Sequence, residues 1–409
     1  MNEREFYHHI KDGEFAFVDY PLQGISALYS HGTEVQDKIS DKFINKLTDR
    51  GYSKVTLPQS VPETFISHLH KKGLFIAKNE NREFYLSGSM EMQATSLAKT
   101  MVLSHKDLPL RFFSKSTVYR ECDSSSLIKS PEYISYELNS YFNTKTEAED
   151  EMVNTGKIAE SWLTELNIPF VAVKAKPESD SPIVLYVYFP FSGSFGTIFW
   201  GGVVGKKYSE KVNFKYHGSD NKQHLPYQYN AGFTGRILSA YLANNSDKHG
   251  FVLKPSVSPS EILVPRDYKN PINSHNDNQV ENFPFSVTEA RVSGRQNLIN
   301  KFGSMGLPIL LENGKHEIRL TQRNSMTSRW VNQQDLTQTA QHHLYLAETT
   351  TIANSISIHT INDVDETVHL EKNTVYNIPI SAVNKFQQLG LKTIGYVDQE
   401  NVYMVLKKY

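Results

Sequence analysis

The chain has 409 residues, 39% hydrophobic and 21% charged, which is ordinary for a globular protein and excludes a fibrous or disordered one. Its formal net charge of −1 argues against nonspecific binding of nucleic acid, so we expect no DNA partner. A single cysteine, Cys122, excludes an internal disulfide framework. Neither a signal peptide nor a membrane-spanning stretch is evident, so we expect a cytoplasmic protein without a membrane partner.

The first part of the chain combines two long helices with many short strands. Apolar residues recur at helical spacing over residues 33–50, and Gly51 ends this predicted helix. A second amphipathic helix is predicted over 146–166, where Thr146 and Glu149 have the spacing of a capping box. Between and after these helices we predict a shorter helix at 91–99 and strands at 53–57, 82–86, 110–120, 132–142, 171–173, 183–189 and 196–199.

The remaining elements complete an α+β pattern with a largely antiparallel sheet. A polar turn between strands 110–120 and 132–142 predicts a hairpin, and residues 229–245 read as a strand, a turn and a helix. After Pro265, residues 267–282 are rich in Asn, Asp, Pro and Ser and are predicted to be a linker. Beyond them we expect helices at 292–302 and 335–355 and strands at 309–311, 317–321, 393–396 and 402–406.

Gly232, Gly235 and Arg236 stand where a predicted strand turns into a helix. Glycines let the backbone approach a ligand closely, and a guanidinium at this place can stack on a flat ring. A glycine-containing turn that caps a core helix is the alternative. The segment YNAGFTGRILSAYLANNSDKHGFVLKPSVSP, residues 229–259, resembles motif 3 of class II aminoacyl-tRNA synthetases of the prolyl/threonyl branch. The resemblance implies that Arg236 lies on the adenine of ATP, with Gly235 at ATP and Gly232 at the amino acid.

The segment LPLRFFSKSTVYRECDSSSLIKSPEYISYELNSYF, residues 108–142, resembles motif 2, a hairpin of the same family. The resemblance implies that Arg120 holds the α-phosphate of ATP and the substrate carboxylate. A bidentate, planar cation suits this work, because negative charge must be stabilised there during the reaction. A surface hairpin with solvated charges is the alternative. The resemblance also implies contacts with ATP from Glu121, Lys129 and Tyr133, and with the amino acid from Glu137.

This chain departs from the family in three places. Cys122 stands where the family has a glutamate that receives the adenine amino group. The loop CDSSSLIK lacks the arginine or histidine that reaches the γ-phosphate; Lys129 can replace it or be a solvated loop lysine. Residues 192–216 align with the strand that carries a glutamine and a histidine in the prolyl branch. Their replacement here indicates a changed amino-acid pocket with Ser194, Phe199 and Trp200, and Thr197 at ATP.

Two further segments resemble the family. In YLSGSMEMQ, residues 85–93, Ser89 and Glu91 match a Thr-x-Glu loop, which implies that they receive the substrate α-ammonium. The alternative is that Ser89 caps the next helix and Glu91 lies in its first turn. In KVTLPQSVPETF, residues 54–65, Pro58 matches the motif 1 proline, which implies a homodimer. The histidine pairs of the chain lack metal-site spacing, so no metal-binding residues are predicted.

These resemblances divide the chain into three expected parts: a class II synthetase-like catalytic domain (1–262), a reduced anticodon-binding-like α/β domain (263–345) and a carboxyl-terminal α/β extension (346–409). They imply an enzyme that uses ATP with Mg²⁺ to convert an amino acid to an aminoacyl-adenylate, as a prolyl/threonyl-tRNA synthetase-like ligase. The acceptor is tRNA or another molecule such as a carrier. The alternatives are a catalytically altered paralogue, acting as a regulatory, accessory or ligand-binding dimer, and a nucleic-acid accessory factor.

Overall fold

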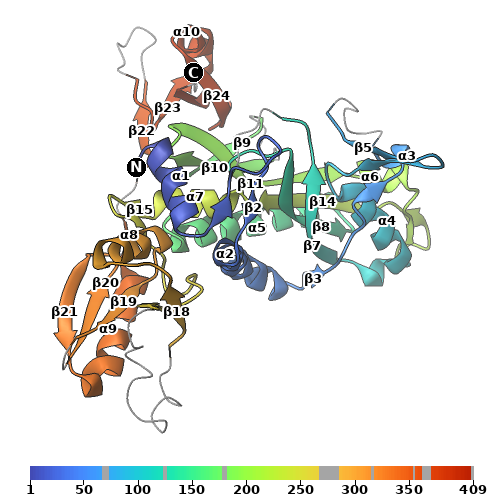
Figure 1. The fold of residues 1–409 in the computed structure, drawn as a ribbon. Coiled ribbons are helices and arrows are strands. Elements are labelled where there is room, and N and C mark those ends of the chain that lie inside the picture. Colours follow the sequence, from blue (N-terminus) through green and yellow to red (C-terminus); the bar gives the residue numbers. More distant parts are fainter. Residues whose placement is uncertain are drawn as a thin grey trace.

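The computed structural model describes residues 1–66, 73–122, 127–176, 182–266, 285–314, 317–352, 355–361 and 370–406. An eleven-stranded sheet runs through the molecule in the order β22-β23-β25-β24-β9-β10-β11-β14-β8-β7-β3 (Figure 1). Its middle strands are antiparallel to their neighbours, which confirms the predicted α+β fold. They are β9 (Phe170–Lys174), β10 (Ile183–Phe189), β11 (Ser194–Gly205), β14 (Tyr227–Thr234), β8 (Glu132–Phe142) and β7 (Leu110–Tyr119), which is followed at the edge by β3 (Ser53–Lys54).

One face of the sheet is covered by α2 (Ser30–Thr48) and α5 (Lys145–Glu165), with α7 (Arg236–Asn244) packed against α2. Aromatic rings fill the space between these layers. The Phe233 ring stacks on Tyr136 with centroids 4.4 Å apart and lies 4.8 Å from Trp162, whose indole Nε1 donates a hydrogen bond to the Ile39 carbonyl. Burial of such large apolar surfaces is the main stabilising contribution to a fold of this kind.

The opposite face is only partly covered, by α4 (Glu91–Met101) and the short α6 (Lys207–Lys211). Ala98 of α4 and Val102, the residue that follows the helix, pack on Phe112 and Tyr141 of the sheet. The small elements on this side and at the amino terminus are α1 (Glu3–Asp12), β1 (Ala16–Phe17), β2 (Ala27–Leu28), β4 (Ser60–Val61), α3 (Glu63–Ile66), β5 (Ile76–Lys78), β6 (Glu83–Leu86), β12 (Tyr216–His217), β13 (Gln223–His224), β15 (Ser246–Asp247) and β16 (Gly250–Phe251).

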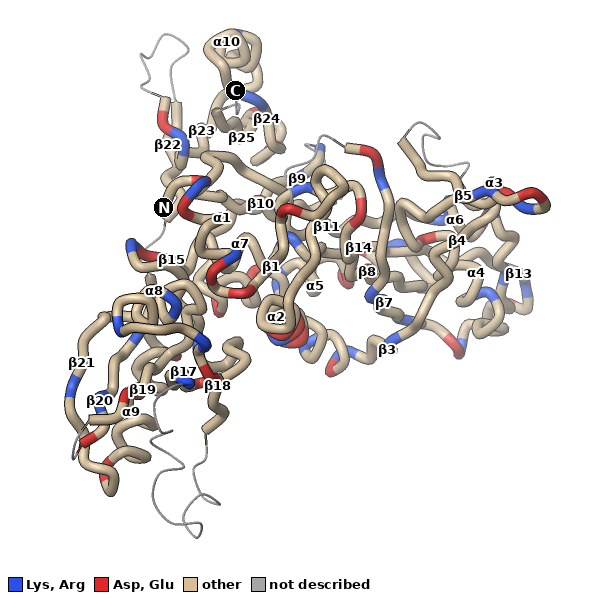
Figure 2. The backbone as a smooth tube through the Cα atoms, in the orientation of Figure 1, with Lys and Arg blue, Asp and Glu red and all other residues tan. Residues whose placement is uncertain are grey.

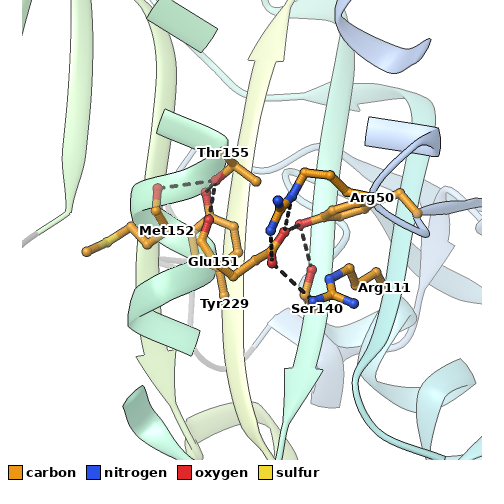
Figure 3. A network of polar contacts seen from close by, with 8 residues as sticks. Arg50, Arg111, Ser140, Glu151, Met152, Thr155 and Tyr229 are labelled. Carbon is orange, nitrogen blue, oxygen red and sulfur yellow. Dashed lines mark hydrogen bonds and ion pairs between the residues drawn. The ribbon is translucent and has the colours of Figure 1, made fainter. Parts of the chain in front are cut away.

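A buried ion-pair network ties α5 to the end of α2 and to the sheet (Figure 3). The Glu151 carboxylate, 2% exposed, accepts from Arg50 Nη2 at 2.9 Å and from Arg111 Nη2 at 3.2 Å. The Tyr52 hydroxyl donates to the same carboxylate at 3.1 Å and accepts from Ser140 at 2.9 Å. Because three donors surround Glu151, a buried negative charge is stabilised where the helix crosses the strands.

Residues 262–349 form a second layered unit beside α1 (Figure 1). Its sheet has the order β18-β17-β19-β20-β21, with parallel pairing of β17 to β18 and β19 and antiparallel pairing further on. Arg323, 1% exposed, forms two 2.9 Å hydrogen bonds to Asp247 and so joins this unit to the first part of the chain. The elements are β17 (Ile262–Pro265), β18 (Val287–Ala290), α8 (Arg295–Met305), β19 (Ile309–Asn313), β20 (Ile318–Gln322), β21 (Thr327–Val331) and α9 (Leu336–Thr349).

The last strands return to the large sheet. β24 (Leu391–Tyr396) meets β9 through a single pairing of Tyr396 with Lys174. Val375 and Val405 share one apolar cluster with Val171 and other residues of the central strands. These last strands therefore extend the edge of the large sheet on both backbone and side-chain evidence. The other elements here are β22 (Ser357–Thr360), β23 (Thr374–Pro379), α10 (Val383–Gln388) and β25 (Asn401–Leu406).

Most predicted elements are confirmed, with shifts at their ends. The capping box of α5 is formed by Thr144 and Glu147 rather than Thr146 and Glu149, because the helix begins one residue earlier than predicted. The long helix predicted at 335–355 ends at Thr349. The linker predicted at 267–282 lies outside the described residues. None of the helices in the described ranges has the length and hydrophobicity needed to cross a membrane.

Candidate active site

Three strands bring Glu137, Gly232 and Trp200 into one row across the sheet. Glu137 of β8 pairs with Gly232 of β14, and Gly232 pairs with Trp200 of β11. Directly paired residues of an antiparallel sheet point to the same face. The neighbouring residues Tyr136 and Phe233 point to the α2/α5 core instead. Glu137 and Trp200 therefore lie on the face that α4 and α6 only partly cover, on either side of a position without a side chain.

The Glu137 carboxylate is held by two neighbours. It accepts from the Met90 backbone N–H at 2.9 Å and from the Ser135 hydroxyl at 3.0 Å. Burial, and next the negative charge of Glu91, raise the pKa of Glu137 to about 7, while these two hydrogen bonds and Arg120 act in the opposite direction. Since two carboxyl groups interact there, the pair is poised to take up a positively charged partner near neutral pH.

The segment before α4 places Ser89 and Glu91 beside Glu137. The Ser87 hydroxyl donates to the Ser89 carbonyl, and Gln93 donates to the Ser87 hydroxyl at 2.8 Å. Ser89 does not cap α4, because the N-cap is Met90 and no side chain caps the helix, whereas Glu91 does lie in the first turn as that alternative predicts. Glu91 Oε2 is buried without a hydrogen-bond partner among the described residues. An unpaired buried carboxylate oxygen is costly and indicates a place for a hydrogen-bond donor.

Arg120 lies just past the end of β7 and reaches across Gly88. Its Nε donates to the Gly88 carbonyl at 2.7 Å, and a Cβ added at Gly88 would lie 3.3 Å from that nitrogen. Gly88 therefore leaves the room that the guanidinium occupies. The positive charge of Arg120 acts to lower the pKa of Glu137, so the guanidinium interacts electrostatically with the carboxyl pair.

Arg236, the first residue of α7, is held by main-chain carbonyls. Its Nη1 donates to Thr197 at 2.6 Å, and its Nε donates to Ile128 at the end of the β7–β8 connection. The Ser239 hydroxyl, one turn on, donates to the Leu127 carbonyl at 2.9 Å. These bonds use the edge of the guanidinium and leave its faces available for stacking.

A cavity of about 380 Å³ lies between the β7–β8 connection, the start of α7 and the amino-terminal segment near β2. Arg120 and Arg236 both line it, so two guanidinium groups face the same space. Burial raises the pKa of Tyr133, while the positive charges of Arg120 and Arg236 act in the opposite direction. The lining of the cavity also includes Glu121, Cys122, Lys129, Glu132 and Gly235, together with the apolar residues Ile25, Leu28, Leu127, Ile128 and Ile134.

The structure brings most of the predicted site residues together, but not Phe199. Phe199 is 1% exposed and packs 5.9 Å from Phe43 in the α2/α5 core, so it cannot line an amino-acid pocket on the other face. The prediction for Phe199 is therefore corrected, because adjacent strand residues point to opposite faces. Thr197 contributes its carbonyl to Arg236, while Lys129 is exposed at the cavity.

Sequence reasoning missed Asn230 and Tyr208. Asn230 lies two residues before Gly232 on the same face of β14. Tyr208 of α6 is buried, and burial followed by the charges of Glu91 and Glu137 raises its pKa. The sequence signal for Asn230 is a polar residue between Tyr229 and Ala231 in a predicted strand, which needs a partner when buried.

Mg²⁺ is the implied ion, and it is usually held by one or two carboxylates together with substrate phosphates. Within the described ranges, no group of three metal-ligating side chains lies close enough to hold a metal ion. Glu132 lines the cavity, whereas the Glu137 carboxylate is taken up by Met90 and Ser135.

Arg120 follows β7 and Arg236 follows β14, so both arginines lie at strand ends of the antiparallel sheet. Residues 74–245 match the family model described as tRNA synthetase class II core domain (G, H, P, S and T). This part of the chain is similar to the core of class II synthetases, and the relatives that the chain resembles are proline–tRNA ligases. The chain is 24% identical to the proline–tRNA ligase of Methanopyrus kandleri over 284 residues, covering 62% of this chain and 56% of the relative. The proline–tRNA ligase of Methanosphaera stadtmanae is 22% identical over 292 residues, covering 64% and 60%.

The chain thus spans between 56% and 60% of the length of these two relatives. The proline–tRNA ligase of Saccharolobus islandicus (strain M.14.25) gives a similar result, with 24% identity over 280 residues, 62% of this chain and 57% of the relative. The match establishes the family of the core, while the activity of this chain is a separate question.

Proposed function

We propose that this chain activates an amino acid with ATP to form an aminoacyl-adenylate. In this reaction a carboxylate oxygen of the amino acid attacks the α-phosphorus of ATP. The bond from that phosphorus to the bridging oxygen breaks, and pyrophosphate leaves with the bonding electrons. The reaction needs little covalent chemistry from the protein, so positioning and charge stabilisation carry it.

Each predicted residue has a role suited to its position. Arg120, which faces both the cavity and the carboxyl pair, orients the carboxylate and stabilises charge on the α-phosphate. Arg236 presents the face of its guanidinium to adenine, since its edge is held by carbonyls. Glu91 and Glu137 receive the α-ammonium, a cation that suits a pair of buried carboxyl groups. Mg²⁺, bound with the phosphates of ATP, adds charge neutralisation.

The observation that carries the proposal is the position of Arg120. This one cation lines the 380 Å³ cavity and acts electrostatically on Glu137, so it lies between a site suited to a nucleotide and a site suited to an ammonium. The reaction needs such a group where the two substrates meet.

The acceptor and the assembly are further parts of the proposal. We propose tRNA as acceptor, with residues 263–345 as the unit that contacts it and residues 346–409 as an extension of the fold. A homodimer is supported by exposed apolar side chains that gather between α1 and α2. They are Phe17, Tyr20, Leu22 and Tyr29, each between 39% and 60% exposed. Burying such side chains in a subunit contact would be favourable. Sedimentation of the purified chain tests the dimer, and tRNA binding over a salt series tests the acceptor.

Pyrophosphate exchange tests the activity. The purified chain is incubated with ATP, Mg²⁺, labelled pyrophosphate and single amino acids. Exchange with one amino acid, reduced at least about a hundredfold in Arg120→Ala and in Arg236→Ala, supports activation. Arg82→Ala is the matched control, because this arginine is exposed and lies away from the cavity. Absence of both exchange and ATP binding in the wild-type chain would contradict the proposal.

A second candidate function is a non-catalytic, ligand-binding dimer. It is favoured by the way Leu127 and Ile128 pack against the core and line the cavity beside Arg236. Cys122, where the family has a glutamate, also lines that cavity. Binding of ATP without exchange for any amino acid would select this candidate.

A further inference from the structure

A second polar row lies next to the row of Glu137 and Gly232. Asn139 of β8 pairs with Asn230 of β14, and Asn230 pairs with Gly202 of β11. Alternate residues of a strand share a face, so Asn230 points to the same side as Gly232 and as the carboxyl pair. The proposed amino-acid site therefore continues along β14 from a glycine to an asparagine.

The side-chain amide of Asn230 is buried and unpaired next to a chain of hydrogen-bonded side chains. Asn230 is 3% exposed, and neither its amide oxygen nor its amide nitrogen has a partner in the part of the chain that is described. Further along the same face, Tyr141 donates to Thr95 at 3.2 Å, Thr95 to Gln228 at 3.2 Å and Gln228 to Asn139 at 3.3 Å. Buried polar groups in folded proteins are nearly always paired, so an orphaned amide indicates a missing partner.

Other orphaned polar atoms surround the same place. Ser114 of β7 pairs with Glu137 in the sheet, and its buried hydroxyl has no partner among the described residues. Glu91 Oε2 is likewise buried without a hydrogen-bond partner among the described residues, and the charge of Glu91 raises the pKa of Glu137. Unpaired atoms from β7, α4 and β14 thus converge around Glu137, where a polar ligand would satisfy them.

Two glycines stand next to Asn230 in the sheet. Gly232 has no side chain between Glu137 and Trp200. A Cβ on Gly202, the sheet neighbour of Asn230, would lie 2.9 Å from Cγ of Pro182 and 3.2 Å from Cζ2 of Trp200, so both rings border Gly202. The resulting surroundings are an aromatic ring on one side, glycine backbone below and an amide at the far end from Glu137.

We propose that this pocket receives the side chain of the amino-acid substrate, and that Asn230 selects a side chain that both donates and accepts hydrogen bonds, a carboxamide above all. The inference rests on the proposed amino-acid activation. An asparagine amide offers two donors and an acceptor, which a carboxamide can match with paired hydrogen bonds. The side chain of proline or valine would leave the amide buried and unpaired, which a site of this kind discriminates against strongly.

Binding and exchange are measured in parallel on the full chain. Titration calorimetry with asparagine, glutamine, proline and valine is expected to give at least about tenfold tighter binding of a carboxamide amino acid. Asn230→Ala should remove this preference. Asn230→Asp keeps the size of the side chain but loses the amide donors, so it should also weaken carboxamide binding. Asn377→Ala is the matched control: Asn377 of β23 also carries a buried, unpaired amide oxygen in the described structure but lies in the carboxyl-terminal strands.

The outcomes separate this inference from the proposed function. Tighter binding of proline or valine, or an unchanged carboxamide preference in Asn230→Ala and Asn230→Asp, overturns the inference, and exchange with such an apolar amino acid would leave activation standing. Carboxamide binding that depends on Asn230 but occurs without exchange supports the pocket and overturns activation. If no amino acid binds, the assignment of the pocket is overturned. Thermal unfolding of each variant shows that it is folded before it is compared.

Discussion

Replacing Glu151 tests how much the buried ion-pair network contributes to stability. Glu151→Gln keeps the shape of the side chain but removes the charge that faces Arg50 and Arg111 (Figure 3). Removing one partner of a buried ion pair costs about 3–5 kcal/mol, because the other charge stays behind. Here the side chains of Arg50 and Arg111 are 32% and 19% exposed, so water can solvate them in part. The expected loss is therefore at the lower end, about 3 kcal/mol.

Urea unfolding, followed by circular dichroism and by tryptophan fluorescence, measures this loss. Glu149→Gln is the matched control on the same helix. Glu149 pairs with Lys145 one turn away at the surface, so its replacement should cost no more than about 0.5 kcal/mol. If the two variants lose equal stability, the network does not hold α5 to the sheet and the reasoning is refuted.

Three further results are expected. The pKa of Glu137 is raised to about 7 in the folded chain, so folding disfavours the ionised carboxylate. The free energy of unfolding therefore falls as pH rises from the ordinary pKa of a glutamate through 7. Urea unfolding of Glu137→Gln should therefore show a gain over wild type that grows from pH 5 to pH 8, and a constant difference would contradict this. Burial lowers the pKa of His31 to about 4, so the unfolded chain takes up a proton first as pH falls below 6.5 and the fold loses stability. His31→Gln should flatten this part of a melting-temperature profile between pH 7 and pH 4.5; an unchanged slope would count against it. Arg323→Ala should cost about 3 kcal/mol by chemical unfolding, because Arg323 is buried against Asp247, while exposed Arg329→Ala should cost little; equal losses would argue against that ion pair.

The fold could be predicted where strand-forming residues gather. The strands 132–142 and 183–189 are predicted with the bounds that the structure gives, because both are rich in β-branched and aromatic residues. β11 is longer than the predicted 196–199, since its glycines weaken the strand pattern. Helix α1 escaped prediction because it buries only Phe6 and Ile10, although Asn2 and Glu5 form a capping box.

Only those residues of the candidate site that lie in recognisable motifs could be predicted from the sequence. Arg120, Glu137 and Arg236 were singled out by their segments, and the structure places them around one cavity and one sheet face. Which of Phe199 and Trp200 faces that site depends on the register of β11, which the sequence does not reveal. Asn230 likewise gains meaning only from its pairing with Asn139 and Gly202.

The formal charge is equally uninformative about individual sites. Figure 2 shows acidic and basic residues interspersed along the chain, in keeping with a net charge of −1. The cavity brings Arg120 and Lys129 of the β7–β8 connection together with Arg236 of α7, which lies more than a hundred residues further along the chain, and Glu121 and Glu132 also line it. Local charge at the site is thus a product of topology rather than composition.

The return of the last strands to β9 also sets an order of events during synthesis. β9 and β10 are made long before β24, so until the carboxyl-terminal residues leave the ribosome the backbone of β9 is an open sheet edge, next to the apolar cluster of Val171, Val173 and Val184. Open edges with apolar faces pair readily with other chains. β24 therefore reaches this edge of the central sheet only after residue 391 has been synthesised, through one backbone pairing and an apolar cluster that includes Val375 and Val405.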